Sequence, residues 1–191
     1  MFYKPFGCVT AHRDDRFPVV MDYFRHLDNE KLSPVGRLDR ETEGLLIITD
    51  DGVWNQRMIH PSFHVPKTYE FMALGTLDEQ KLQKLSQGVL LTGADHPTTG
   101  AQVTVTGKST LSRICPALHP DMQKKLRHNL PEHPVVHGTI TITEGKKRQI
   151  RRMLKTVGCC VIFLKRISIG DIVLNPELKP GEYIEMNFTR T

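Results

Sequence analysis

The chain has 191 residues, of which 39% are hydrophobic and 25% are charged, and its formal net charge is +5. This length is enough for one full-sized domain or two closely joined halves, and these proportions of hydrophobic and charged residues are typical of a soluble globular protein. No apolar run approaches the roughly 18 residues of a membrane span, and the N-terminus lacks the layout of a signal peptide. We therefore expect a cytoplasmic protein without a membrane partner.

Cysteines and histidines give no sign of a metal or disulfide framework. The four cysteines form no CxxC pair, which is typical of a reduced protein. Cys159 and Cys160 lie in a strand-like run, and we expect both to be buried as small hydrophobic side chains. His119, His128 and His133 lie in one segment, but their spacing fits no standard zinc ligand set. We expect no metal site.

The first half of the chain reads as strands alternating with short helices. Residues 2–10 are expected to form a strand that Pro5 and Gly7 interrupt, and the apolar side chains of residues 16–27 recur at helical spacing. The further expected elements are a strand at 45–49, a helix at 53–59 and a strand at 67–74.

The second half continues this alternation. Thr76 to Glu79 fits a capping box that begins a helix ending at Gly88, and a second, basic helix at 149–157 should end at Gly158. The expected strands are 89–91, 101–106, 139–143, 160–164, 166–169 and 183–188. Many strands with few short helices favour an α+β fold around a mixed, mostly antiparallel sheet.

Residues 107–137 stand apart from this pattern. The segment contains four prolines, and we expect one helix from Pro120 to about His128 between loops. We interpret the segment as a surface insertion or an extended hairpin arm.

One carboxylate has an unusual setting. Asp39 lies between Arg37 and Arg40, shortly before an apolar strand. Opposite charges nearby favour the ionised form of a carboxylate, which suits a nucleophile or base that acts on an anionic substrate. As an isolated residue, Asp39 would more simply be a helix cap or a salt-bridge partner, and the two arginines would be solvated. Asp50 or Asp51 is better placed to cap the helix that follows.

Basic residues concentrate in one stretch. Residues 145–166 contain eight of them and no Asp or Glu: Lys146, Lys147, Arg148, Arg151, Arg152, Lys155, Lys165 and Arg166. A solvated helix face usually mixes both signs, so this one-sided patch favours a polyanionic partner such as RNA. The stretch alone would equally support a non-catalytic RNA-binding module.

Four segments together resemble the RsuA-type bacterial ribosomal RNA pseudouridine synthase family. The longest is similar to the motif that carries the family's catalytic aspartate, and it reads Gly-Arg-Leu-Asp-Arg-Glu-Thr-Glu-Gly-Leu-Leu-Ile-Ile-Thr-Asp-Asp-Gly over residues 36–52. The others are Tyr3-Lys4-Pro5-Phe6-Gly7, with Tyr3 in place of the more usual Asn, then Lys67-Thr68-Tyr69, and the run from Glu144 to Met153.

The resemblance implies a catalytic domain over residues 1–191, built as two joined subdomains, that isomerises uridine to pseudouridine without a cofactor. Asp39 would be the catalytic carboxylate, Arg151 would pair with it, and Tyr69 would lie against the uracil ring. Without the family context, Tyr69 would be an ordinary strand residue. The implied RNA-binding residues are Arg37, as the wedge that replaces an extruded uridine, with Arg40, Lys146, Lys147, Arg148 and Arg152.

The choice of RNA rests on fewer residues. Trp54, Arg57, His64 and Tyr183 resemble the branch that acts on small-subunit ribosomal RNA. The alternatives are large-subunit ribosomal RNA, transfer RNA or a non-catalytic RNA-binding module. The absence of a phosphate-binding glycine loop or a cofactor motif counts against an unrelated enzyme for an anionic small molecule. Members of this branch usually carry a preceding S4-like RNA-binding domain, whereas this sequence starts directly at the first catalytic motif; either the protein lacks that domain naturally or the sequence is truncated. We expect a monomer that binds ribosomal RNA, within a partly assembled subunit.

Overall fold

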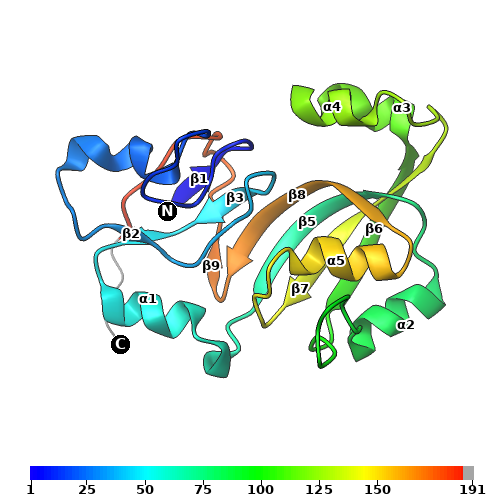
Figure 1. The fold of residues 1–191 in the computed structure, drawn as a ribbon, viewed down its shortest axis with the longest axis horizontal. Helices are drawn as coiled ribbons and strands as arrows, with labels where there is room; N and C mark the ends of the chain where they lie inside the picture. Colours follow the sequence, from blue (N-terminus) through cyan, green and yellow to red (C-terminus); the bar gives the residue numbers. More distant parts are fainter. Residues whose placement is uncertain (187–191) are drawn as a thin grey trace. The chain divides into compact units, whose positions relative to one another are not determined.

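The computed structural model describes residues 1–186 and divides the chain into two units. Unit one consists of Met1–Val65 together with the segment that begins at Lys165, and unit two consists of Pro66–Leu164. The helices and strands of each unit are labelled in Figure 1.

Unit one is built on short strands around the N-terminus. Strand β1 (Phe2–Lys4) pairs antiparallel with β3 (Glu43–Leu46), and β3 pairs parallel with the end of β8 (Cys160–Ile169). Strand β9 (Ile172–Val173) pairs antiparallel with β8, and β2 (Ser33–Pro34) pairs with β4 (Ile48–Thr49) in a separate ribbon. Its helices are η1 (Val20–Leu27), α1 (Gly52–Ile59) and η2 (Pro61–Phe63).

A cluster of buried apolar side chains forms the core of unit one. It joins β1, β3 and the end of β8 to the segment that follows β9: Tyr3, Val35, Leu45, Ile47, Ile169, Leu174 and Leu178. Trp54 and Met58 of α1 pack against this cluster from outside. Helix α1 is therefore held by two large side chains, although none of its residues is fully buried.

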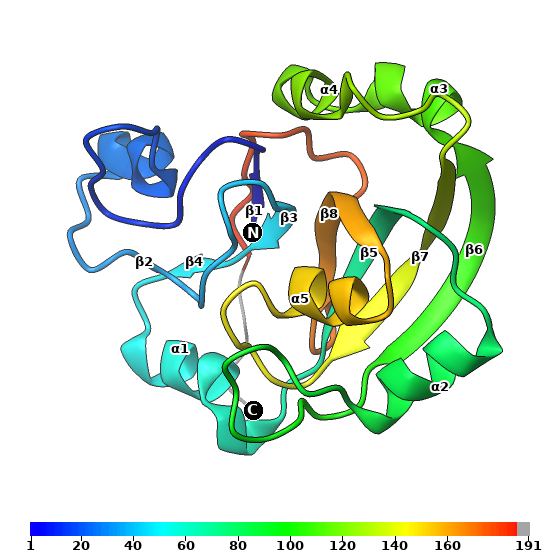
Figure 2. The same ribbon diagram turned by 45° about the vertical axis from the view of Figure 1, so that its right-hand side comes forward.

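Unit two is a sheet with the strand order β8–β5–β7–β6. Strands β5 (Lys67–Leu74) and β6 (Gln102–Thr110) both pair antiparallel with β7 (Pro134–Ile142). Helix α2 (Glu79–Gln87) lies between β5 and β6 in the sequence, and α5 (Gln149–Thr156) lies between β7 and β8. Figures 1 and 2 show α5 lying across the sheet of this unit.

The alternation of β5 determines which way Tyr69 points. Tyr69, Phe71 and Ala73 are buried while Glu70 is exposed, as the two-residue period of a strand requires. Tyr69 lies opposite Ile140 of β7, so both side chains are on the same face of the sheet.

The connection between β6 and β7 is ordered. It contains α3 (Leu111–Ile114), η3 (Cys115–Ala117) and α4 (Pro120–Leu126), which confirms the helix expected from Pro120. The buried apolar side chains of the connection are Leu111, Leu118, Met122 and Leu126. The connection closes through a hydrogen bond of 2.9 Å from Leu111 N to His133 O.

Several expected elements are confirmed. Strand β5 has the expected bounds, and α1 and α5 agree with expectation to within one residue. Helix α2 ends before Gly88, whose φ of 89° favours glycine. In the larger sheet, β3 pairs parallel with β8, whereas β1–β3, β5–β7, β6–β7 and β8–β9 are antiparallel pairs, so the expected α+β fold with a mixed, mostly antiparallel sheet is confirmed.

Other element predictions are wrong. Asp78 caps α2 by accepting a hydrogen bond from Lys81 N, so the capping box from Thr76 does not form. The expected strand at 45–49 divides between β3 and β4, which have different partners. Residues 89–91 form no strand, because Val89 bonds to Thr98 within a loop.

Three further boundaries differ from expectation. The helix predicted from residue 16 begins only at Val20, and it is the tighter 3-10 type. Strand β8 runs unbroken through Lys165, and its first residue, Cys160, is exposed while Cys159 is buried. Tyr183 forms a bridge to Phe2, and the end of the expected strand at 183–188 lies outside the described residues. None of the helices within residues 1–186 has the length and apolar character needed to cross a membrane.

Candidate functional site

Asp39 lies in the loop between β2 and β3 of unit one, and its side chain is half-buried. Arg37, two residues earlier, is exposed. Arg40 is half-buried, because its guanidinium lies 4.5 Å from the centre of the Phe17 ring and 3.6 Å from a carboxylate oxygen of Glu41. Arg37 is therefore the more accessible of the two cations that flank Asp39.

Hydrogen bonds from the N-terminal segment hold both sides of Asp39. The Thr10 hydroxyl donates to Leu38 O at 2.9 Å and accepts from Leu38 N at 3.1 Å. A hydroxyl can do both, since it carries one donor and two acceptor positions. On the other side, Gly7 N donates to Arg40 O at 2.8 Å. The backbone before and after the carboxylate is thus fixed.

Lys4 is a buried cation that the sequence analysis did not assign to the site. Its ammonium group donates to Thr42 O at 2.8 Å and to Pro5 O at 2.9 Å, and the side chain is fully buried. Burial lowers the pKa of Lys4 to about 8, although nearby acidic groups, Asp39 among them, act in the opposite direction. The sequence feature that could have indicated this buried cation is a lysine that directly follows Phe2 and Tyr3 in an apolar strand.

Gly44, in the strand after the Asp39 loop, lies where the backbone of β8 leaves no room for a side chain. Its φ is 97°, and a Cβ atom at this position would strike the backbone of Arg166 on the parallel strand β8. Arg166 is itself buried, and its Nε donates to Leu45 O at 2.8 Å. The close approach of β3 and β8 therefore requires glycine here.

Tyr69 belongs to unit two and is 7% exposed. The neighbouring Thr68 shares a hydrogen bond of 2.9 Å with Thr141 on β7, which ties the start of the strand to the sheet. An aromatic ring fixed in this way could support a flat base by stacking.

Arg151 and Arg152 extend from α5 and are both half-buried. Arg151 Nη1 donates to Val161 O of β8 at 3.1 Å. Arg152 Nη2 donates to Thr92 O at 2.6 Å, in the loop that precedes β6. Both side chains therefore have defined directions.

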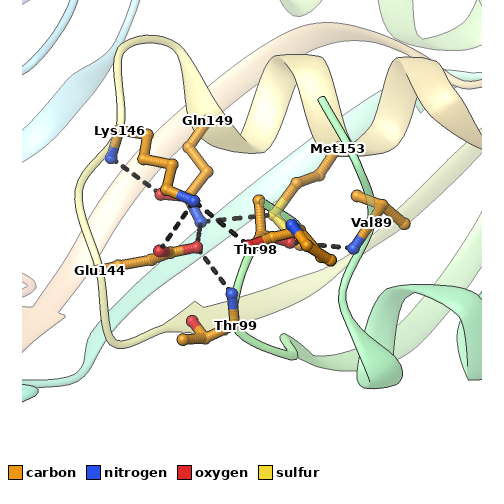
Figure 3. Close-up of polar contacts among 8 residues, drawn as sticks. Val89, Thr98, Thr99, Glu144, Lys146, Gln149 and Met153 are labelled. Atoms are coloured by element: carbon orange, nitrogen blue, oxygen red, sulfur yellow. Dashed lines mark hydrogen bonds and ion pairs between the residues drawn. The ribbon is translucent and has the colours of Figure 1, made fainter. Parts of the chain in front are cut away.

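A polar network holds the turn before α5 (Figure 3). Glu144 Oε1 accepts hydrogen bonds from Gln149 Nε2 at 2.6 Å and from Thr99 N at 2.9 Å. Gln149 Oε1 accepts from Lys146 N at 2.9 Å, and Lys146 Nζ lies 3.4 Å from Glu144 Oε2. Arg148 has a left-handed backbone, with φ of 52°.

The predicted residues thus fall in both units. Asp39, Arg37 and Arg40 share one loop of unit one. Unit two contains the others: Tyr69, Lys146, Lys147, Arg148, Arg151 and Arg152. A half-buried carboxylate on a fixed loop could act as a nucleophile or a base. Across residues 1–186, no three His, Cys, Asp or Glu side chains gather as metal ligands would.

Known proteins are similar to this chain over almost its whole length. The family model described as RNA pseudouridylate synthase matches residues 1–156. Ribosomal small subunit pseudouridine synthase A of Haemophilus influenzae is 32% identical over 96% of this chain and 67% of that protein. Ribosomal large subunit pseudouridine synthase E of Vibrio parahaemolyticus is 35% identical, over 97% and 72% respectively. A crystal structure of pseudouridylate synthase has a TM-score of 0.78 and 30% identity, over 97% of this chain and 68% of that one.

Proposed function

Because the chain belongs to the RNA pseudouridylate synthase family, we propose that it converts a specific uridine of small-subunit ribosomal RNA to pseudouridine. The reaction breaks the bond between C1′ and N1, turns the uracil and joins C1′ to C5. The C5 proton is lost and N1 gains a proton, so substrate and product are isomers. The proposal therefore needs no redox cofactor or metal.

The observation that carries the proposal is the fixed loop around Asp39. Thr10 and Gly7 hold the backbone on either side of this carboxylate, and Arg37 is exposed beside it. Such a group is preorganised to attack C1′ or to remove a proton from the sugar. Asp39 is the residue that we propose for this step.

Arg151 and Tyr69 are proposed to complete the site. Arg151 would pair with the Asp39 carboxylate by charge-assisted hydrogen bonds and keep it ionised. Tyr69 would stack on the uracil and could help to remove the C5 proton. A replacement that keeps the ring, Tyr69→Phe, should therefore preserve substrate binding better than Tyr69→Ala.

The RNA would be bound by cations and read by its shape. A paired uridine cannot reach a carboxylate inside a protein, so it has to be extruded, and Arg37 is the proposed wedge. Lys147 and Arg148 are exposed and are the best candidates for phosphate contacts. Arg40, Lys146 and Arg152 already have protein partners, so RNA contacts by these three would come in addition to structural roles.

Small-subunit ribosomal RNA is the proposed substrate, in a partly assembled subunit. Relatives named for the small subunit and for the large subunit have similar identity to this chain. The choice of small-subunit RNA therefore rests on four residues that resemble that branch: Trp54, Arg57, His64 and Tyr183. Bound ribosomal proteins can hold RNA in the shape to be recognised. We propose that the protein acts as a monomer in the cytoplasm.

Chemical mapping of pseudouridine tests this proposal. The protein is incubated separately with naked small-subunit RNA, small-subunit assembly intermediates, large-subunit RNA and transfer RNA. We expect one new pseudouridine in small-subunit RNA, with the highest yield in an assembly intermediate. Product only in large-subunit or transfer RNA would contradict the substrate but not the reaction. RNA binding without any product would favour a non-catalytic module.

A further inference from the structure

We infer that Glu144 and Gln149 are a pair of positioning residues that fix the start of α5 and tie it to the loop of residues 92–99. The inference rests on the proposed function, because the side chains that the pair would position are Arg151 for catalysis and Lys147 with Arg148 for RNA binding. Neither Glu144 nor Gln149 needs to contact the RNA in this role.

The start of α5 needs such support. Arg148 precedes the helix with a left-handed backbone, which is unfavourable for a residue with a side chain, and it provides no side-chain cap for the first turn. Gln149 closes this turn from inside. Its side-chain oxygen Oε1 accepts from Lys146 N at 2.9 Å, and its backbone N donates to Lys146 O at 3.1 Å.

Glu144 connects this turn to a loop that is distant in sequence. One oxygen of its carboxylate accepts both the amide of Gln149, at 2.6 Å, and the backbone N of Thr99, at 2.9 Å (Figure 3). Gln149 is 3% exposed, so this pair lies largely out of water, where a charged acceptor strengthens a hydrogen bond. Removing either side chain would leave buried polar groups without partners.

Two basic residues near the pair hold the same loop. Lys146 Nζ donates to Pro97 O at 3.4 Å, and Arg152 Nη2 donates to Thr92 O at 2.6 Å. The loop is thus fixed at Thr92, Pro97 and Thr99 by side chains that all lie between Glu144 and Arg152. The basic stretch therefore has two parts: Lys146 and Arg152 hold the loop, while Lys147 and Arg148 remain exposed for RNA.

The effect on chemistry would pass through α5. Arg151 is two residues beyond Gln149, and its guanidinium is directed by Val161 O of β8. If the first turn of α5 moved, Arg151 would move with it. A misplacement of about 1 Å can lower a catalytic rate by about a hundredfold.

The test uses a pair of exchanges that preserve size. Gln149→Glu places two carboxylates within hydrogen-bond distance, with the ammonium group of Lys146 as a cation 3.4 Å from Glu144, so their contact forms only when one of the two holds a proton. We expect single-turnover release of tritium from C5-labelled RNA to fall at least about tenfold at pH 8 and to recover toward pH 6, where the shared proton restores the contact. The double variant with Glu144→Gln and Gln149→Glu restores one amide and one carboxylate, so the hydrogen bond between positions 144 and 149 can form with the roles exchanged. The amide nitrogen that donates in this bond cannot also accept from Thr99 N, so the contact with Thr99 is lost. We expect it to recover part of the rate lost at pH 8, without the added pH dependence.

A matched control separates the pair from a general effect of charge. Gln83→Glu adds a carboxylate at an exposed position of α2 and should leave the rate unchanged at both pH values. Hydrogen exchange of the Thr99 amide, measured without RNA, should accelerate in the Glu144→Ala variant and in the double exchange, and stay slow in the Gln83→Glu control.

Two results would overturn the inference. One is a Gln149→Glu variant as active at pH 8 as the original protein. The other is a double exchange that remains as slow at pH 8 as Gln149→Glu. A protein that makes no pseudouridine in any RNA would contradict the proposed function instead, and the exchange of the Thr99 amide would still report whether the pair fixes the loop.

Discussion

The Asp39 loop and the start of α5 hold their candidate catalytic residues by different means. The Asp39 loop is anchored by Thr10 and Lys4, which are 28 and 38 residues from the carbonyls they bind. The start of α5 is anchored by Glu144 and Gln149, which are only five residues apart. The first arrangement exists only when unit one has folded, whereas most of the second is local. Substitutions that disturb the Asp39 loop should therefore lower both activity and stability, whereas substitutions at the start of α5 should lower mainly activity.

The two regions also differ in the placement of charge. Lys4 is fully buried against the Asp39 loop, whereas Lys146 and Arg152 keep contact with water beside α5. A buried ammonium group is expensive unless its donors are satisfied, so Lys4 depends on the carbonyls of this loop. Lys4 thus fixes the backbone of the loop, and the loop carbonyls in turn stabilise the buried ammonium group.

The largest expected effect is at Asp39. Asp39→Asn keeps the size of the side chain and removes the charge, so we expect a loss of at least about a thousandfold in tritium release from C5-labelled RNA. RNA affinity should stay within a few-fold of the original, because no phosphate contact is removed. An Asn variant with normal turnover would remove Asp39 from the mechanism. Asp50→Asn is the control, since that exposed residue lies outside the anchored loop.

The next largest effect is expected at Arg151. Arg151→Met removes the proposed partner of Asp39, and we expect the single-turnover rate to fall by about a hundredfold. Arg151→Lys keeps the charge but not the two parallel donors, so it should recover only part of the loss. Equal activity of the Met, Lys and original proteins would show that the two regions act independently.

Lys4 gives a prediction about stability and pH. Its pKa is about 8 in the folded protein and 10.5 ordinarily, so between these values the unfolded chain binds a proton that the folded chain does not. The contribution of Lys4 to stability is therefore least favourable below pH 8 and improves as the pH rises toward 10.5. We expect the unfolding free energy of the original protein, relative to that of Lys4→Met, to rise by up to about 3 kcal/mol over this range. Urea unfolding at pH 7.5 and pH 10 measures it, and parallel pH profiles would contradict the prediction.

Thr10 tests the anchoring of the loop more gently. Thr10→Val has nearly the same shape but loses both hydrogen bonds to Leu38, so we expect about a tenfold lower rate and about 1–2 kcal/mol lower stability. Thr10→Ser keeps the hydroxyl and should retain both. If Ser and Val behave alike, the hydroxyl does not position Asp39. Rates and urea unfolding curves for the three proteins decide this.

Sequence patterns predicted the local part of each region better than the distant part. Strand β5 and helix α5 could be predicted from short runs, because strand alternation and helix periodicity act over a few residues, and the Asp39 motif was found through its resemblance to a family. The hydroxyl of Thr10 and the ammonium of Lys4 could not be assigned, because their partners are carbonyls that the fold brings near. The strand expected at 45–49 failed for the same reason, since different strands pair with its two halves. The sequence did not predict a positioning role for Gln149, because a side chain that bonds to its own turn has no effect on periodicity.

The smallest expected effect concerns RNA affinity and separates the two parts of the basic stretch. Lys147 and Arg148 are exposed, so replacing both with Ala should remove two phosphate contacts and leave α5 in place. The slope of the logarithm of affinity against the logarithm of salt concentration should then become shallower by about 1.4 to 1.8 units, from roughly 0.7 to 0.9 per contact. Neither Arg nor Ala favours the left-handed backbone at position 148, so the change does not relax the turn. Replacing Lys84 and Lys179, two exposed lysines elsewhere, is the matched control and should leave the slope unchanged.

Replacing Lys146 and Arg152 instead should slow the reaction at saturating RNA, because those two side chains hold the loop of residues 92–99. The same slope and rate in both double variants would mean that the basic stretch is a single uniform patch.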